Sequence, residues 1–253
     1  MTTAPAHPDI WARLRRATAA RIGLGRSGHG LPTKAMLELE AAQALARDAV
    51  HAPLADDAIV AALHGLPTIA VDSKAEDRRT YLARPDLGRR LAPAALARLA
   101  RGDCDLAIVL ADGLSAGAVA ACGPPLARAL LEQLPDWRVA PIVVARQARV
   151  ALGDEIGAAL GAQLVVVLIG ERPGLSAPES LGAYITWRPT VGRRDAERNC
   201  ISNIRAGGLP VDDAAARIIW LLRAARRLEL TGVGLKDDRP IDLGTEALPP
   251  PSP

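Results

Sequence analysis

Short, uninterrupted apolar runs alternate with helical patterns along the second half of the chain. The apolar runs are "CDLAIVLADG" from residue 104, "VAPIVVA" from 139 and "QLVVVLIG" from 163, with a further strand near "AYITW". The helical patterns are "SAGAVAA", "PPLARALLEQLP", "DEIGAALGA" and the long segment 211–230. Strands that are apolar throughout and alternate with helices indicate a parallel sheet buried on both faces. We therefore predict an α/β fold with a doubly wound, mostly parallel Rossmann-like sheet.

The first hundred residues have a different pattern, and we expect a mainly helical region there. Apolar residues recur at helical spacing in four segments: 9–20, 31–51, 56–65 and 93–102. Thr33 and Asp56 are the expected N-caps. "TIAV" is a candidate strand and residues 84–90 a loop. The predicted division is a mainly helical region over residues 1–101, an α/β domain over 102–231 and a proline-rich tail over 232–253.

Composition and charge narrow the classes of protein that fit. The chain has 253 residues, 49% of them hydrophobic and none of them Phe, so the core must be aliphatic. A net charge of +3 from 31 basic and 28 acidic residues is too balanced to indicate a nucleic-acid partner. Three cysteines without a C-x-x-C pair predict a reducing, intracellular setting with neither a disulfide framework nor a zinc site. The apolar runs are also shorter than the ~20 residues of a membrane span.

A glycine-rich segment, "GLGRSG" at 23–28, matches the dinucleotide-binding pattern letter for letter. That function requires a strand before the segment and a helix that begins within it. Here an arginine-rich helix precedes the segment and Pro32 delays the next helix, so an elbow between helices is favoured. Arg21 and Arg26 on that elbow are candidates for docking a partner's carboxylates.

Polar residues follow two predicted strands at the edge where open α/β sheets bind their ligands. "LADGLSAG" places Asp112 and Ser115 there, and Ser115 is equally suited to be an N-cap. "GERPG" places Glu171 there, in a turn stiffened by Pro173. A surface turn with a self-neutralised Glu–Arg pair is the alternative, and a binding role is favoured because a rigid loop at this edge is often functional.

Cys200 lies in "DAERNCISNIRAGG", a segment that is rich in polar groups and has little periodicity. A nucleophilic role would need a histidine base, but the four histidines lie at positions 7, 29, 51 and 64. A half-buried thiol that lines a pocket is therefore the favoured interpretation.

The motifs together resemble one family, the small subunits of ethanolamine ammonia-lyase, an adenosylcobalamin-dependent enzyme. The matching stretches run in order from about residue 18 to 204. They are "TAARIGLGRSG", "LPTKAMLELEAAQALARDAVH", "YLARPDLGRRL", "ADGLSA", "LIGERPGLSAPESLGAY" and "ERNCISNI". The pairing of "GERPGL" with "CISNI" is the most specific part of the match.

The resemblance implies a role shared with a second chain. The family's enzyme converts ethanolamine to acetaldehyde and ammonia by radical chemistry. A large subunit, a TIM barrel, holds the substrate, and the small subunit docks on it and closes over the cobalamin. The positions that match the family's cofactor contacts are Val150, Glu171 and Cys200, and no catalytic residue is expected in this chain, which should be inactive alone.

Two further expectations concern the cofactor and the location of the enzyme. Cobalamin proteins that displace the cofactor's lower base use a His in a D-x-H-x-x-G motif, which is absent here. The residues two before each histidine are Pro5, Ser27, Ala49 and Ala62. We expect base-on cofactor with cobalt not ligated by this chain. Family resemblance suggests a bacterial microcompartment, whereas the short N-terminal region suggests free cytoplasm.

Two rival functions remain open at this point. One is a stand-alone nucleotide-binding α/β enzyme that uses "GLGRSG" or "ADGLSAG". The other is a nucleic-acid module built on Arg13, Arg15, Arg16 and Arg21, which predicts strongly salt-dependent binding. Neither accounts for "GERPGL" together with "CISNI".

Overall fold

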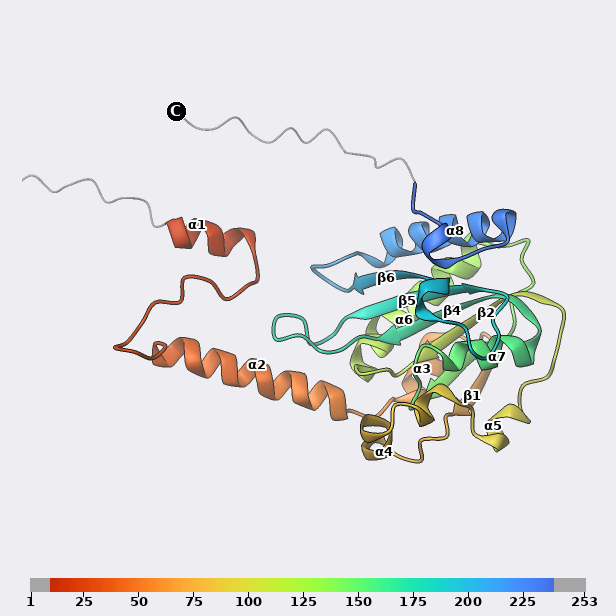
Figure 1. The fold of residues 1–253 in the computed structure, drawn as a ribbon, viewed down its shortest axis with the longest axis horizontal. Coiled ribbons are helices and arrows are strands. Elements are labelled where there is room, and N and C mark those ends of the chain that lie inside the picture. The colour runs from red at the N-terminus through yellow and green to blue at the C-terminus, as the bar shows by residue number, and fades with distance from the viewer. Residues whose placement is uncertain (1–9, 239–253) are drawn as a thin grey trace, which may run out of the picture.

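A six-stranded mixed sheet forms the centre of the molecule (Figure 1). The computed structural model describes residues 10–238. The strand order is β1-β3-β2-β4-β5-β6, and the first four strands in that order are parallel. β5 and β6 are antiparallel to their neighbours β4 and β5. The strands are β1 Thr68–Asp72, β2 Cys104–Ala111, β3 Ile142–Arg146, β4 Ala162–Gly170, β5 Leu181–Trp187 and β6 Arg198–Ile204. The predicted α/β class with a mostly parallel sheet is confirmed.

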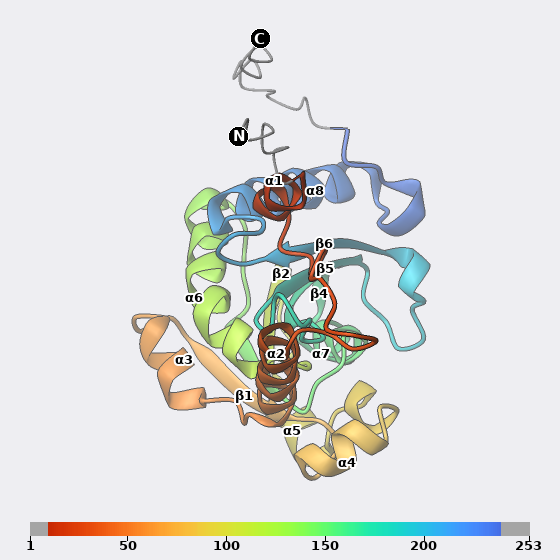
Figure 2. The ribbon, with the colours of Figure 1, turned by 90° about the vertical axis from the view of Figure 1, so that its left-hand side faces the viewer.

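Helices cover both faces of the sheet, as the continuous apolar strands predict. Along β2, Leu106, Ile108 and Leu110 join the core beneath α3, α6 and α8, whereas Ala107 and Val109 join the opposite core beneath α5 and α7. This alternation follows from the period of two along a strand. The helices are α3 Asp56–Ala62, α5 Pro93–Leu96, α6 Ala116–Gln133, α7 Leu152–Leu160 and α8 Val211–Leu228. Figure 2 shows α6 and α8 along one side of the strands.

Several local predictions in the helical regions are wrong. Pro32 and Ala55 hold the N-cap positions in place of Thr33 and Asp56, which are the first residues of their helices. Asp56 instead pairs with Arg146 at 3.0 Å, so its carboxylate is engaged by a neighbouring strand. The helix opened by Pro93 ends at Leu96, well before Gly102.

Before residue 102, two segments form regular structure that the sequence did not predict. Helix α4, Arg78–Ala83, precedes the expected loop and is capped by Asp77, which accepts a hydrogen bond from Thr80 N at 2.6 Å. A short 3-10 turn, η1 Leu87–Arg89, lies inside that loop.

Helix α6 is continuous where two helices were expected. Pro124 lies within it and is buried in the core, so packing outweighs the lost backbone hydrogen bond.

The sheet includes a strand from the N-terminal region of the chain. β1 lies before residue 102, yet it pairs with β3 along its whole length, from Thr68 with Ile142 to Asp72 with Arg146. The division into regions 1–101, 102–231 and 232–253 stays a prediction. A boundary at residue 102 would separate β1 from the sheet to which it is hydrogen-bonded.

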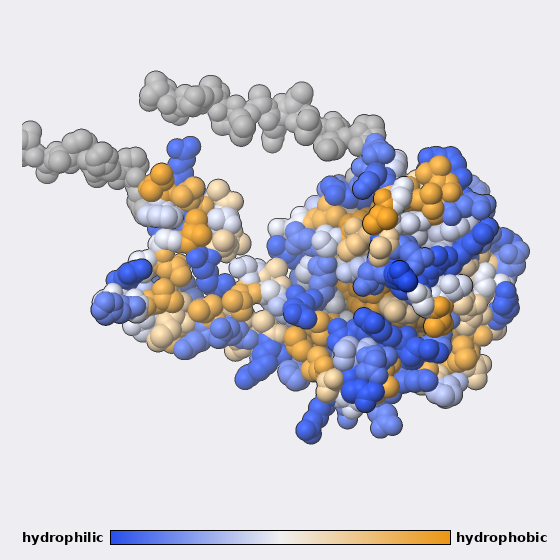
Figure 3. Space-filling model, viewed as in Figure 1, coloured by the Kyte–Doolittle hydropathy of each residue, from blue (hydrophilic) through white to orange (hydrophobic). Residues whose placement is uncertain are grey.

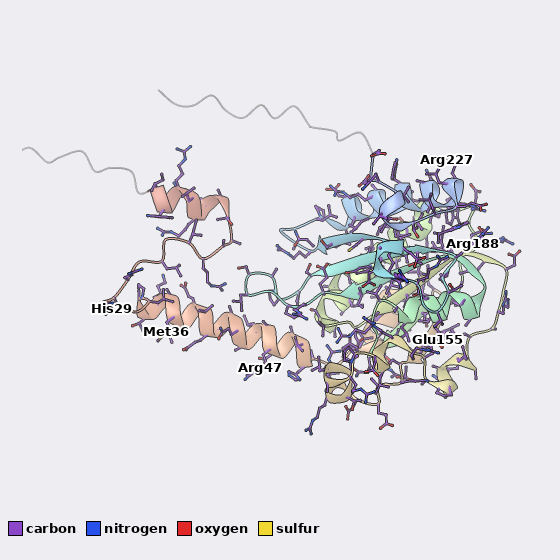
Figure 4. The ribbon with its side chains drawn as sticks, in the orientation of Figure 1. His29, Met36, Arg47, Glu155, Arg188 and Arg227 are labelled. Carbon is purple, nitrogen blue, oxygen red and sulfur yellow. The ribbon has the colours of Figure 1, made fainter. Side chains whose placement is uncertain are left out.

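Helices α1, Ile10–Ala17, and α2, Thr33–His51, extend away from the body, and we call residues 10–51 the N-terminal arm (Figure 1). Only Ala35 and Ala42 of the two helices are buried. Figure 3 shows apolar surface along the arm, and Figure 4 places His29, Met36 and Arg47 along its length. The exposed large apolar residues of the arm are Ile10, Trp11, Leu14, Leu31, Met36, Leu37 and Leu45.

No helix within residues 10–238 is long and apolar enough to cross a membrane.

Candidate functional site

Three loops meet at the carboxyl edge of the parallel strands, because parallel strands end at the same edge of a sheet. They are residues 112–115 after β2, 147–151 after β3 and 171–180 after β4. The loops after β2 and β4 touch. A Cβ on Gly170 would overlap the carbonyl oxygens of Asp112 and Ser115, so only glycine fits there. This close approach fixes the point from which Glu171 projects.

Glu171 is held in place through one of its two carboxylate oxygens. Ser180 Oγ donates to Glu171 Oε2 at 2.6 Å, and Asn203 N donates to the same oxygen at 3.2 Å. The backbone is fixed as well, because Glu171 N donates to Ser180 O at 2.8 Å. Oε1 accepts no hydrogen bond from any residue in the range 10–238, and it lies over Gly182. The side chain is thus oriented by the protein with one acceptor oxygen still available.

The alternative of a self-neutralised Glu–Arg turn does not hold. Arg172 is exposed, and the described part of the chain contains no ion pair between Arg172 and Glu171. The neighbouring partners of Glu171 are a hydroxyl and a backbone N–H, so the negative charge of Glu171 is not cancelled locally.

Cys200 on β6 and Tyr184 on β5 lie close enough to Glu171 for its charge to act on both side chains. Cys200 pairs with Tyr184 across β5 and β6. The Cys200 thiol is exposed, so the expectation of a half-buried thiol is wrong. Partial desolvation by neighbouring groups raises the pKa of the thiol, a hydrogen bond with Tyr184 lowers it, and the charge of Glu171 raises it again, with a net rise that keeps the thiol protonated near neutral pH. Burial also raises the pKa of Tyr184, with Cys200, Glu171 and Asp195 adding to the effect. The structure therefore places a neutral thiol, a neutral phenol and a carboxylate together.

The loop that carries Val150 is held by a buried aspartate. Asp112 accepts hydrogen bonds from Gln147 N at 2.8 Å and Ala148 N at 2.9 Å, and Arg78 Nη1 donates to it at 3.2 Å. Burial raises the pKa of Asp112, and the backbone hydrogen bonds act in the opposite direction. Gln147 has a φ of 53°, a left-handed conformation that these bonds stabilise. Asp112 is only 2% exposed and shapes the loop from within the protein.

Val150 itself is half-buried at the end of this loop, immediately before α7. Tyr81 donates from its hydroxyl to Ala148 O at 2.9 Å, and Arg149 N donates to Gly88 O at 2.8 Å. Val150 packs against the same core layer as Tyr184. It also lines a pocket of about 160 Å³ together with Asp195, the residue whose charge acts on Tyr184. The three predicted contact residues, Val150, Glu171 and Cys200, therefore border the same face of the sheet. Tyr184 and Asp195 lie close to them.

The other candidates from the sequence have different roles. The hydroxyl of Ser115, at the N-cap position of α6, makes no cap bond and donates to Pro178 O at 3.2 Å. Arg21 donates to Leu175 O at 3.2 Å and Ser176 Oγ at 3.4 Å, so it binds its own chain. Arg26 is exposed.

The glycine-rich segment at 23–28 lacks the surroundings that nucleotide binding requires. No strand precedes it, because α1 is the only regular element before it in the described range, and α2 begins at Thr33. The dinucleotide interpretation is therefore wrong. Among residues 10–238, no group of three or more His, Cys, Asp or Glu side chains is placed to hold a metal ion.

Comparison with known proteins decides the family. The family model described as ethanolamine ammonia-lyase light chain (EutC) matches residues 8–236. The chain belongs to this family. The protein is the small subunit of an ethanolamine ammonia-lyase, a carbon–nitrogen lyase.

Three relatives named ethanolamine ammonia-lyase small subunit match this chain over nearly their whole length. The one from Bradyrhizobium diazoefficiens is 56% identical over 233 residues, which cover 89% of each chain. The one from Azotobacter vinelandii is 52% identical, over 92% of this chain and 90% of the relative. The one from Pseudomonas fluorescens is 49% identical, over 94% and 91%.

Sequence reasoning missed three residues that this ethanolamine ammonia-lyase subunit places at the site. Tyr184 is brought against Cys200 only by the antiparallel register of β5 and β6. Arg149 and Asp195 both line the pocket beside Val150, although they come from loops that lie far apart in the sequence. The one available signal was the position of Arg149 directly before a predicted contact residue.

Proposed function

We propose that this small subunit binds adenosylcobalamin jointly with the large subunit, through Val150, Glu171 and Cys200, while the large subunit carries the substrate site. The holoenzyme then converts ethanolamine to acetaldehyde and ammonia. The observation that carries the proposal is the state of Glu171. Its Oε2 is fixed by Ser180 and Asn203, and its Oε1 accepts no hydrogen bond from residues 10–238 at the ligand-binding edge of the sheet.

The chemistry of these residues fits the periphery of a corrin ring. Cobalamin is a large, mostly uncharged disc with amide side chains at its rim, and amide N–H groups need acceptors. Glu171 Oε1 is such an acceptor, on a side chain that is already oriented. Val150 and the protonated thiol of Cys200 offer soft, weakly polar surface against which a ring packs.

The division of labour follows from the chemistry of the residues at the site. The cofactor, when bound, supplies the cobalt–carbon homolysis that starts the radical reaction. Glu171, Val150 and Cys200 position and shield it. The described range holds no histidine near them, since His29, His51 and His64 are exposed and precede β1. This arrangement supports a cofactor that keeps its own benzimidazole on the cobalt.

A base-on cofactor makes a spectroscopic prediction. The EPR spectrum of cob(II)alamin in the holoenzyme should show superhyperfine coupling to the nitrogen of the cofactor's own base. Labelling the protein's histidines with ¹⁵N should leave the spectrum unchanged. A change in the coupling pattern on labelling would show that a protein histidine ligates the cobalt.

The N-terminal arm supports the second half of the proposal, a large-subunit partner. Leu45 is 60% exposed and Trp11 50% exposed, on helices that bury almost nothing against their own body. Exposed apolar residues gathered on one element are typical of a protein interface. We propose that the large subunit docks on this arm. Whether the assembled enzyme is enclosed in a microcompartment stays a prediction.

Reconstitution tests the proposal. Purified small subunit with adenosylcobalamin and ethanolamine should form no acetaldehyde, and acetaldehyde should appear when the large subunit is added. Replacing Leu37 and Leu45 together by glutamate should weaken the association, because two charges would be buried in an apolar interface. Both the association and the activity at low subunit concentration should fall.

Lys34→Glu is the matched control, since Lys34 is an exposed polar residue on the same helix. It adds a negative charge to α2 without removing apolar surface and should affect association little. Turnover by the small subunit alone would contradict the division of labour. Equal effects of the leucine and lysine variants would contradict docking through the arm.

A further inference from the structure

We propose that Arg149, assisted by Arg89, forms a phosphodiester-binding subsite beside Val150, and that its ligand is the phosphodiester of the cofactor's nucleotide tail. The inference rests on the proposed function and extends it to residues with no assigned role. It is carried by a pocket, by an arginine that lacks a counter-ion among the described residues, and by the disposition of the neighbouring carboxylates.

The pocket lies between η1 and the start of α7. It has a volume of about 160 Å³ and is lined by Pro85, Arg89, Arg149, Val150, Ala151 and Asp195. Val150 thus belongs both to the proposed corrin contact and to the wall of this pocket. A ligand that lies against Val150 with its disc can place a neighbouring group in the pocket.

Arg149 is held rigidly and, within residues 10–238, has no counter-ion. Its guanidinium stacks on the ring of Tyr81 at 4.4 Å from the centroid, and its backbone N–H donates to Gly88 O. Its Nε is buried and has no hydrogen-bond partner among the described residues. No carboxylate of that range lies within 4.0 Å of its guanidinium nitrogens. A buried N–H donor without an acceptor is costly, so this group indicates a missing ligand.

Nearby arginines differ from Arg149 in this respect. Arg146, three residues earlier, pairs with Asp56 at 3.0 Å and Asp72 at 2.7 Å. Arg90 pairs with Glu155 at 3.4 Å. The guanidinium fork of Arg149 therefore remains available for an anion, and such a fork matches two phosphate oxygens.

The other carboxylates near the pocket pair with cations, whereas the one acidic residue of the lining is exposed to solvent. Asp195 lies 3.6 Å from Arg198 Nε, and its side chain is 94% exposed. Asp154 and Glu155, in the first turn of α7, pair with Arg198 and Arg90. Arg89 is exposed and forms no ion pair with another described residue, so it adds positive charge. The N-terminus of the nine-residue helix α7 adds the positive end of the helix dipole to the pocket.

A phosphodiester fits this environment better than a protein carboxylate does. The proposed contacts of Val150, Glu171 and Cys200 are to the corrin ring and its amide rim, whereas the nucleotide tail carries the one phosphate of the cofactor. A carboxylate from the large subunit is the competing occupant, and it is distinguished by its effect on subunit association in the absence of corrinoid.

Two corrinoids separate the contribution of the nucleotide tail, which contains the phosphodiester, from that of the corrin ring. Adenosylcobinamide lacks the nucleotide tail and its phosphodiester, whereas adenosylcobalamin has both. Binding of each to the reconstituted complex is measured by equilibrium dialysis in the dark. Arg149→Met should raise the Kd for adenosylcobalamin by about tenfold to a hundredfold, because a bidentate, charge-assisted contact is lost. The Kd for adenosylcobinamide should change less than about threefold.

Two further variants serve as a second test of the pocket and as a control outside it. Arg89→Met changes an exposed side chain and should raise the Kd for adenosylcobalamin alone, by less than Arg149→Met does. Arg79→Met, an exposed arginine of α4 outside the pocket, should change neither Kd.

Equal weakening of both corrinoids by Arg149→Met, or no change in either, would overturn the subsite. Weaker association of the subunits in the absence of corrinoid would overturn it in favour of a partner carboxylate. If the wild-type complex bound neither corrinoid, the proposed function itself would fail and the subsite with it.

Discussion

Asp154→Ala is expected to lower the free energy of unfolding by about 3–5 kcal/mol, because it removes the buried counter-ion of Arg198 and leaves only the exposed Asp195, 3.6 Å from Nε. Arg198 donates to Asp154 through two nitrogens, at 2.5 and 2.7 Å, and both side chains are only 2% exposed. Arg198 also donates to Thr186 Oγ1 at 3.0 Å and Arg193 O at 2.9 Å, and these two neutral acceptors do not replace the lost charge.

Thermal unfolding of the small subunit measures this effect. A loss of that size corresponds to a fall in Tm of about 6–20 °C for a chain of this length. Asp86→Ala is the control. It also removes a two-pronged pair, with Arg84, but both partners are about 60% exposed. Its effect on Tm should be much smaller than that of Asp154→Ala, because solvent screens an exposed pair.

Replacing both members of the buried pair tests the reason for the effect. The double variant Asp154→Leu, Arg198→Met leaves no buried charge and should recover most of the lost stability. If Asp154→Ala cost no more than Asp86→Ala, or if the double variant were less stable than the single one, the buried charge would not be the cause.

Glu171→Gln is expected to raise the Kd for adenosylcobalamin by about tenfold to a hundredfold and to leave turnover at saturating cofactor nearly unchanged. The substituted side chain can still accept from Ser180 and Asn203 with its one oxygen. Its NH₂ group then replaces Oε1, so a donor faces the donors of the cofactor's rim. A lost hydrogen bond to a charged group is worth about 1.5–3 kcal/mol, which gives the expected range.

Ser180→Ala is the control for this experiment. It removes a hydrogen bond to Oε2, the internally bonded oxygen, and leaves Oε1 available. Activity is measured against cofactor concentration at saturating ethanolamine in the reconstituted enzyme. The control should raise the Kd for adenosylcobalamin much less than Glu171→Gln does. A collapse of turnover with unchanged affinity would place Glu171 in the chemistry, and no effect of any kind would make it a structural residue.

The sheet was predictable where its strands are apolar on both faces. β2, β3 and β4 are buried almost throughout, so their apolar runs stand out from the helices between them. β6 was missed because it is largely exposed, with Cys200, Ser202 and Asn203 open to solvent. Its polar residues have the composition of a loop, and only pairing with β5 makes it a strand.

The site was only partly predictable, for a similar reason. The position of Glu171 follows from local sequence, since an apolar strand delivers it to the carboxyl edge of the sheet. Its geometry does not, because the bonds to Oε2 come from Ser180 and from the distant Asn203. The placement of Val150 likewise depends on Asp112 and Tyr81, which precede it by dozens of residues. Such contacts are set by tertiary structure and leave no periodic signal.

The central claim is that this subunit supplies one side of a cofactor site completed by its partner. Equilibrium binding of adenosylcobalamin to the small subunit alone, the large subunit alone and the reconstituted complex tests it most directly. Tight binding should appear only in the complex and should weaken when the small subunit carries Glu171→Gln. Equally tight binding by the large subunit alone would contradict the account.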